Sequence, residues 1–244
     1  MTAIHTHQLS NGLTLIAEPI AGVRSLAMTL LTPAGVIAEP DDKSGIAALT
    51  SEMICRGAGD LDARAHSDAL DQLGVDRGTS SESRYMRLSA TMLSDKAADA
   101  LPLLTDMFRR PALPADALEP SRDLALQSLD ALEDEPQHKV FIHLRSRHYP
   151  SPLSRSPYGE REALEAMTID DVQAFVRNRF VAGGSVLAFA GCLDWPKLRD
   201  LVDRTIGQWG SATDEPRIAP DDTAPRGYHH VKSDTAQVHI GLGY

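Results

Sequence analysis

Two segments near the start of the chain alternate apolar and polar residues, the pattern of a strand with one buried face. In "NGLTLIAEP" an Asn-Gly turn precedes Leu13 and Leu15, and in "RSLAMTLLTPAG" the apolar positions are Leu26, Met28 and Leu30. The second segment ends at a Pro-Ala-Gly sequence, which favours a turn. Both segments are therefore predicted to be strands that pack one face on a core.

A third segment, "RYMRLSATML", shows the clearest alternation of all. One side carries Met86, Leu88, Ala90 and Met92, and the other side carries polar residues. Strands with one solvated face are typical of antiparallel sheets. A further short and apolar strand is predicted in "GSVLAFAG".

Helical periodicity separates these strands. In "SGIAALTSEMICRGAG", residues 44–59, the residues Ile46, Leu49, Met53 and Ile54 recur at the spacing of one buried helical face. The same reasoning predicts further helices over 62–73, ended by Gly74, over 94–110, capped by Ser94, over 115–133 and 137–148, over 169–180, capped by Thr168, and over 194–209.

The composition of the chain changes after residue 209. Residues 210–227, "GSATDEPRIAPDDTAPRG", are rich in proline, acids and small residues and show no periodicity, which is typical of a linker. Residues 228–244 read as two short strands, but they are too few to bury a core. We therefore expect a first domain over 1–209, a linker over 210–227, and the first strands of a second domain over 228–244.

Composition and charge narrow the range of functions. Of the 244 residues 42% are hydrophobic, and 24 basic against 34 acidic side chains give a formal net charge of −10. Such a chain can bury a core unaided, whereas its charge opposes binding to nucleic acid or to anionic lipid. No apolar run approaches about 18–20 residues and no signal peptide is visible, so we expect a cytoplasmic protein without a membrane partner.

Cysteines and histidines offer no evident metal or nucleophile site. Cys55 and Cys192 each lie in an apolar segment, which favours small buried side chains over a disulfide. Motifs for serine nucleophiles and for nucleotide phosphates do not occur in the sequence. The following histidines have no carboxylate or cysteine at ligand spacing and are interpreted as surface or interface residues: His5, His7, His138, His143, His148, His229, His230 and His239.

Several segments along the chain carry a resemblance that no single one of them would establish. They are "LSNGLTLIAEP", "TPAGVIAEPDDKSGIAALTSEMICRGAG", "LEDEP", "SPLSRSPYGERE", "MTIDDVQAFVRNRF", "SVLAFAGCLDW" and "AQVHIGLGY". In this order they resemble the pitrilysin/insulinase family of zinc peptidases, in its compact form related to mitochondrial processing peptidase. The resemblance implies an α+β fold, a mostly antiparallel sheet with helices packed on one face, followed by a second domain of the same kind.

The zinc site of that family can be carried over residue by residue, and every one of its five positions departs from the pattern. The first zinc histidine falls on Ala48, the catalytic glutamate on Ser51 and the second histidine on Glu52. The Glu-Asp-x-Pro landmark places the third ligand at Ser128 and an assisting glutamate at Ser121. Zinc needs three imidazole, thiolate or carboxylate ligands, and this set supplies one carboxylate. We therefore predict no metal site in this chain.

Peptide hydrolysis by this chain is not expected for a second reason, which is the lack of a catalytic base. Ser51 cannot replace a glutamate as the base that accepts a proton from water. Glu52 is interpreted as a solvated helix residue that pairs with Arg56 at i+4, rather than as a relic ligand. We therefore expect no hydrolysis of peptides by this chain alone.

The resemblance also implies that the segment 74–92 can bind a peptide as an added strand. In the family the matching strand lies at the edge of the sheet beside the zinc helix, and substrate adds to it as a further strand. Thr79, Ser80 and Ser81 fall where the family contacts the peptide backbone. The alternative for these three residues is an ordinary polar turn before the next strand.

The resemblance leads to a functional hypothesis, in which the chain is the non-catalytic subunit of a two-subunit zinc peptidase. A homologue with an intact H-x-x-E-H motif would supply zinc and catalysis, while this chain would hold no cofactor, close the chamber and help to hold peptide. The alternative is a structural core subunit without a proteolytic partner, like the respiratory-complex proteins that share the fold. A neighbouring gene for an intact homologue favours the first hypothesis. A third reading, an active peptidase with an unorthodox metal site, is tested by zinc analysis.

Overall fold

The structure, a computed structural model, describes residues 4–210, 227–232 and 237–243. Its centre is a six-stranded sheet in the order β1-β2-β8-β3-β7-β6, in which β2 and β8 are parallel and the other neighbouring pairs are antiparallel. The predicted fold class is confirmed. The strands are β1 (His5–Gln8), β2 (Thr14–Pro19), β3 (Ser25–Thr32), β6 (Asp76–Ser81), β7 (Met86–Leu93) and β8 (Val186–Gly191).

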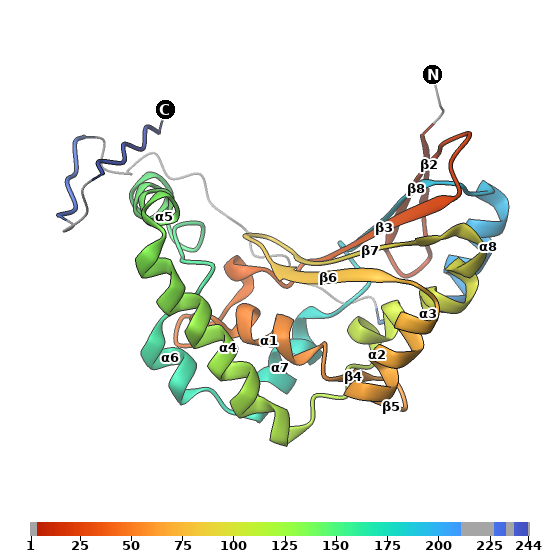
Figure 1. The fold of residues 1–244 in the computed structure, drawn as a ribbon, viewed down its shortest axis with the longest axis horizontal. Helices are drawn as coiled ribbons and strands as arrows, with labels where there is room; N and C mark the ends of the chain where they lie inside the picture. The colour runs from red at the N-terminus through yellow and green to blue at the C-terminus, as the bar shows by residue number, and fades with distance from the viewer. Residues whose placement is uncertain (1–3, 211–226, 233–236, 244) are drawn as a thin grey trace.

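Helices pack on one face of this sheet, and the opposite face is open in the view of Figure 1. The helices beneath the sheet are α1 (Ile46–Met53), α2 (Ala63–Gln72), α3 (Ala97–Arg109), α7 (Ile169–Arg179) and α8 (Trp195–Ile206). Three more lie toward one side: α4 (Leu118–Ala131), α5 (Pro136–His148) and α6 (Arg161–Ala166). The remaining short elements are the strands β4 (Gly57–Ala58) and β5 (Leu61–Asp62) and the 3-10 turns Val36–Ala38, Ser94–Lys96, Ala115–Ala117 and Leu132–Asp134.

The apolar stripes read from the sequence form the core between the sheet and the helices. Along β7 every second side chain is buried, and along β3 the same alternation holds. In α1 the four residues of the predicted stripe are at most 1% exposed: Ile46, Leu49, Met53 and Ile54. Because a strand buries alternate residues, the other half of the side chains of β3 and β7 lies on the open face of the sheet.

Among the elements that were not predicted are β1 and α6, and both bury little. β1 reads His-Thr-His-Gln, which shows no apolar alternation because the strand pairs only with β2 at the edge of the sheet. The ring of His5 instead stacks on Trp195 with the ring centroids 5.0 Å apart. α6 has six residues, of which Leu164 is the buried one, so it is too short to show helical periodicity.

The predicted helix over 44–59 is shorter in the structure. α1 ends at Met53, and the chain then forms the small β4–β5 hairpin. Gly57 and Gly59 adopt φ values of +111° and +61°, which L side chains rarely adopt and which an α-helix does not allow. These glycines therefore set the point by which the helix has to stop.

The predicted cap at Ser94 and the predicted burial of the cysteines are wrong. Ser94 begins a 3-10 turn, and its backbone N–H donates to the carbonyl of Arg24 (3.0 Å), which extends the pairing of β7 with β3 past the end of the strand. Cys55 and Cys192 are exposed, and both lie past the end of their element, two residues after α1 and one residue after β8 respectively.

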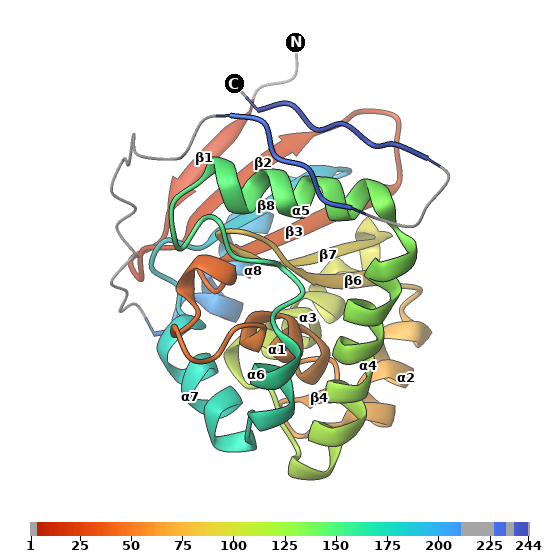
Figure 2. The same cartoon turned by 90° about the vertical axis from the view of Figure 1, so that its left-hand side faces the viewer.

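The end of the chain also differs from the prediction. Within 227–232 and 237–243, which the structure describes, residues form no strand, and the predicted linker lies almost entirely outside the described ranges. Gly241 lies beside Val140 and Leu144 of α5, along which this segment runs (Figure 2). The domain boundaries at 209 and 227 stay predictions. In the described part of the chain, no helix combines the length and the apolar character needed to cross a membrane.

The first turn of α1 is capped by a buried carboxylate from the preceding turn. Glu39 is 5% exposed, its Oε2 accepts from the N–H of Gly45 (3.1 Å) and its Oε1 accepts from the N–H of Ala47 (3.0 Å). The Arg155 guanidinium donates to the backbone carbonyl of Glu39 (2.5 Å). Burial raises the pKa of the Glu39 carboxyl from 4.5 to about 7, although the two backbone donors and the charge of Arg155 lower it.

We predict that Glu39 makes the stability of the fold depend on pH. Because the pKa of this carboxyl is higher in the folded state than in the unfolded state, the folded state holds the proton between pH 4.5 and about 7. Its contribution is full below pH 4.5 and is lost as the pH rises through 7, by roughly 3 kcal/mol at most. Urea unfolding at a series of pH values should show this loss in the wild type and not in Glu39→Gln.

The control for this experiment is Asp95→Asn, which changes an exposed carboxylate elsewhere. Its unfolding free energy should follow the pH dependence of the wild type. An equally steep loss of stability between pH 5 and 8 in Glu39→Gln would contradict the assignment to Glu39.

Candidate functional site

The positions that the resemblance assigns to the zinc site lie on α1 and α4, next to the edge of the sheet. α1 packs against both the edge strand β6 and α4 (Figure 1). On α1, Ala48 and Glu52 are half-buried and Ser51 is 7% exposed. Ser121 on α4 is fully buried, whereas Ser128, two turns further along α4, is exposed.

The hydroxyl and carbonyl of Ser51 are both engaged within the protein. Its Oγ donates to the carbonyl of Ala48 (2.8 Å), one turn earlier in the same helix. Its carbonyl accepts from Thr79 Oγ1 on β6 (3.1 Å) and from Cys55 Sγ (3.6 Å). Ser51 therefore fastens the end of α1 to the edge strand, and its hydroxyl is not positioned as a base.

Arg56 contacts Ser121 rather than Glu52, so the predicted i+4 pair between Glu52 and Arg56 is wrong. Its Nε donates to Ser121 Oγ (3.3 Å), and no ion pair joins it to Glu52 among the described residues. The reason is that α1 ends at Met53, so Arg56 lies beyond the helix and no longer follows its side-chain spacing. The bond links the end of α1 to α4.

These residues do not fit a zinc ion. Each of the three serine hydroxyls has a protein partner, since Ser128 Oγ donates to the carbonyl of Leu124 (3.0 Å). The guanidinium of Arg56, a cation, is bonded at one of the positions where the family has a carboxylate. Three donors of the imidazole, thiolate or carboxylate type are required, and Glu52 alone qualifies. Over the described ranges, no group of three or more histidine, cysteine, aspartate or glutamate side chains could hold a metal ion.

Thr79, Ser80 and Ser81 lie in the edge strand β6 and not in a turn. Among the strands that the structure describes, β6 pairs only with β7, and the polar turn follows at residues 82–85. The side chain of Thr79 points toward α1, where it meets Ser51 and Cys55. Ser80 Oγ, on the other face, accepts from Arg87 Nε (3.3 Å). The alternative of a plain turn for these residues is therefore excluded by their position.

Within the described part of the chain, the outer edge of β6 has no strand paired to it. At the end of the hairpin, the N–H of Glu82 donates to the carbonyl of Tyr85 (2.8 Å). In an antiparallel pair the bonding residues alternate, so Asp76, Gly78 and Ser80 direct their backbone groups to β7. The residues between them, among them Thr79, direct their N–H and C=O groups outward. This edge could accept one more strand.

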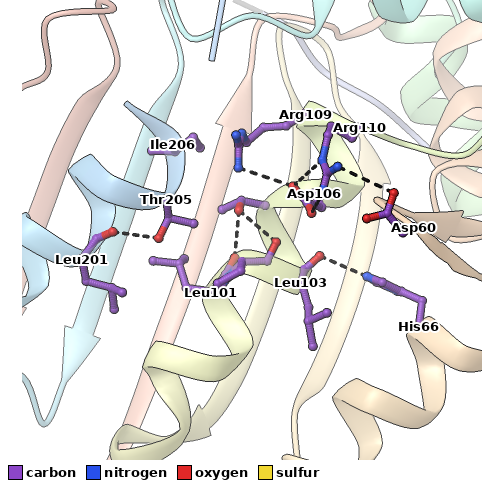
Figure 3. A network of polar contacts seen from close by, with 12 residues as sticks. Asp60, His66, Leu101, Leu103, Asp106, Arg109, Arg110, Leu201, Thr205 and Ile206 are labelled. Atoms are coloured by element: carbon purple, nitrogen blue, oxygen red, sulfur yellow. Dashed lines mark hydrogen bonds and ion pairs between the residues drawn. The ribbon is translucent and has the colours of Figure 1, made fainter. Parts of the chain in front are cut away.

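One buried histidine was missed by the sequence analysis, and the structure gives it a structural role. His66 on α2 is 2% exposed, and its Nε2 lies 3.0 Å from the carbonyl of Leu103 on α3 (Figure 3). Nearby, Asp106 accepts from Arg110 (2.8 Å) and Arg109 (3.4 Å) within α3. The sequence signal was its i, i+4 spacing to the buried Leu70.

Two hollows lie on the surface near α1 and β6. One, of about 400 Å³, lies between the 38–43 turn and α7, away from the degenerate positions, and Lys43 and Asp171 in its wall pair with each other (3.1 Å). The other, of about 240 Å³, lies beside β6 and is lined by Asp76, Arg77, Gly78, Ser89, Ala90 and Thr91.

Comparisons with known proteins agree on one family. The family model described as insulinase (peptidase family M16) matches residues 18–160. The mitochondrial-processing peptidase subunit beta of Saccharomyces cerevisiae is 24% identical over 243 residues, which cover 97% of this chain and 53% of that protein. A probable subunit beta from Arabidopsis thaliana is 23% identical over 204 residues, which cover 83% of this chain and 38% of that protein.

A solved structure from Pseudomonas fluorescens, described as a peptidase M16 inactive domain, has the same fold. Its TM-score is 0.79 at 21% sequence identity, and the match covers 91% of this chain and 54% of that one. At 21% sequence identity, this comparison shows that the two chains share a fold and nothing more. The chain thus spans between 38% and 54% of the length of these three similar proteins.

The bond between Arg56 and Ser121 generates a prediction about stability. Ser121→Ala removes a fully buried hydroxyl and leaves the half-buried Arg56 guanidinium without this partner, so it should lower the free energy of unfolding by about 1 kcal/mol. Ser128→Ala, on an exposed turn of the same helix, should change it by less than about 0.5 kcal/mol and serves as the matched control. Urea unfolding of both variants measures the difference, and equal effects would contradict the described contact.

Proposed function

Because the chain belongs to the insulinase family of peptidases (M16), we propose that it is a non-catalytic subunit that pairs with a homologue carrying an intact H-x-x-E-H motif. One combined observation carries this proposal. The positions assigned to the zinc site do not supply enough zinc ligands, whereas the edge strand β6 still presents backbone groups to which a peptide can pair. In the paired protein, the homologue supplies zinc and the catalytic base. This chain supplies a wall of the chamber and a strand edge for peptide.

The contacts of the degenerate positions support a non-catalytic role. Ser51 and Ser121 are held by Ala48, Thr79 and Arg56 in a set of bonds between α1, β6 and α4. Such bonds stabilise the packing of these elements but provide no metal ligand and no proton acceptor. Ser51, which the resemblance assigns to the catalytic glutamate, therefore makes structural contacts in this proposal.

The edge of β6 supports a role in peptide binding. Its outward backbone groups can form the hydrogen bonds of an added strand whatever the side chains of the peptide are. The bond from Thr79 Oγ1 to the carbonyl of Ser51 anchors the middle of β6 to α1, so the edge is held in place before peptide arrives. A rigid edge lowers the entropy lost on binding.

The similar proteins support pairing. The yeast and Arabidopsis relatives are named as the beta subunit of a processing peptidase, and the Pseudomonas fluorescens structure is described as an inactive domain. A subunit role combined with a missing catalytic site is what the proposal assigns to this chain. The net charge of −10 would favour basic peptides in the shared chamber.

We predict that peptidase activity requires a second chain. The full chain and a homologue with an intact H-x-x-E-H motif, taken from the same genome, are purified alone and after co-expression, and cleavage of a library of unstructured peptides is measured. Activity should be absent from this chain alone and at least about tenfold higher in the mixture than in the homologue alone. Equal activity of the homologue with and without this chain would contradict the proposal.

A substitution in β6 shows whether the added activity depends on the edge. Thr79→Pro removes an N–H that points outward, which an edge strand tolerates, so the chain should fold and still pair but should lose the gain in activity. Thr79→Val keeps that N–H and removes only the hydroxyl, so it should keep most of the gain. The same loss in both variants would show that the hydroxyl, and not the edge, is responsible.

A further inference from the structure

Alternate side chains of β6 lie on opposite faces of the sheet, one covered by helices and the other open. Arg77 and Thr79 point toward the helices, since Arg77 donates to Asp71 (3.1 Å) and Ser67 (2.9 Å) on α2 and Thr79 donates to Ser51. Side chains alternate along a strand, so Asp76, Gly78 and Ser80 lie on the open face. A strand added to β6 would place alternate side chains beside these three positions.

Gly78 leaves the open face hollow at the middle of the strand. It pairs with Ser89 of β7, and the hollow of about 240 Å³ is bounded there by Asp76, Ser89 and Thr91. A Cβ placed on Gly78 would meet only Ser89 Oγ at 3.8 Å, which is ordinary van der Waals contact. The hollow is therefore open to a side chain from a neighbouring strand, and a larger residue at position 78 could be accommodated by the fold.

Asp76 gives this hollow a negative charge. It is exposed, and no hydrogen bond or ion pair of its side chain is present among the described residues. Arg77 also lines the hollow, but its guanidinium bonds to Asp71 and Ser67 on α2, on the other face of the strand. Arg87 is paired with Glu82 (3.1 Å) near the opposite end of β6. A carboxylate with no neighbouring partner beside an empty hollow favours a cationic group there.

We propose that this hollow is a side-chain subsite that takes a lysine or arginine side chain of a peptide aligned on β6. The inference rests on the proposed function, because it requires a strand added to the edge. The methylene groups of the basic side chain would lie over Gly78, and its charged end would reach Asp76. Asp76 would then determine which residue of the peptide occupies this position and in which register the peptide binds.

The test uses the full chain and a set of short, fluorescently labelled peptides of low complexity. A single lysine is moved along the peptide, and norleucine at the same position provides an uncharged side chain of similar length. Binding is measured by fluorescence anisotropy at low and at high salt. At one position the lysine peptide should bind about two- to fivefold more tightly than the norleucine peptide, and salt should reduce this ratio.

Variants separate the subsite from general electrostatic attraction. Asp76→Asn should reduce the lysine preference to about one, and Asp76→Lys should make a glutamate peptide the preferred one. Asp99→Asn, an exposed carboxylate on α3, should keep the wild-type ratio. Gly78→Val fills the hollow, so at the same position it should weaken both the lysine and the norleucine peptides relative to an alanine peptide.

The outcomes distinguish this inference from the proposed function. Peptides that bind and lose affinity in Thr79→Pro, but show no lysine preference or keep it in Asp76→Asn, would overturn the subsite and leave edge binding intact. An equal loss of the preference in Asp99→Asn would also overturn the subsite. Peptides that do not bind at all, or that bind equally to wild type and Thr79→Pro, would overturn the proposed function and the subsite with it.

Discussion

Helix α1 begins inside the protein, so the free N–H groups of its first turn need a partner that is not water. Glu39 provides this partner from the preceding turn, at a position where its own carboxylate is almost fully buried. At the other end of the helix, the carbonyl of Ser51 accepts from Thr79 on β6. The helix is thus fixed at both ends, and its placement sets the relation between the degenerate positions, the edge strand and α4.

This arrangement separates two properties that an active peptidase of the family would need together. Metal binding and proton transfer depend on particular side chains, and the five positions that the resemblance assigns to the zinc site carry other ones. Strand addition depends on backbone groups, which remain whatever side chains replace the originals. A chain can therefore lose the first property by a few substitutions and keep the second. At these assigned positions the structure shows the bond of Ser51 to Ala48 and the bond of Arg56 to Ser121.

Periodicity predicted β2, β3, β7, β8, most helices and the buried stripe of α1, because the side chains of these elements pack into one core. It failed where local contacts decide the structure. The end of α1 depends on the positive φ angles of Gly57 and Gly59, and β1 pairs by its backbone without an apolar pattern. The resemblance located the degenerate positions but could not predict the partner of Arg56, since Ser121 reaches it only through the packing of α1 on α4.

The central claim is that the positions predicted to correspond to the family's zinc site cannot hold zinc in this chain, and zinc content tests it most directly. The purified full chain is equilibrated with micromolar free zinc, dialysed against a weak chelator and analysed by mass spectrometry for metal and protein in the same sample. The account predicts far less than one zinc per chain and no cleavage of peptides by this chain. One zinc per chain that survives dialysis, together with cleavage that disappears when Glu52 is replaced by Gln, would contradict it.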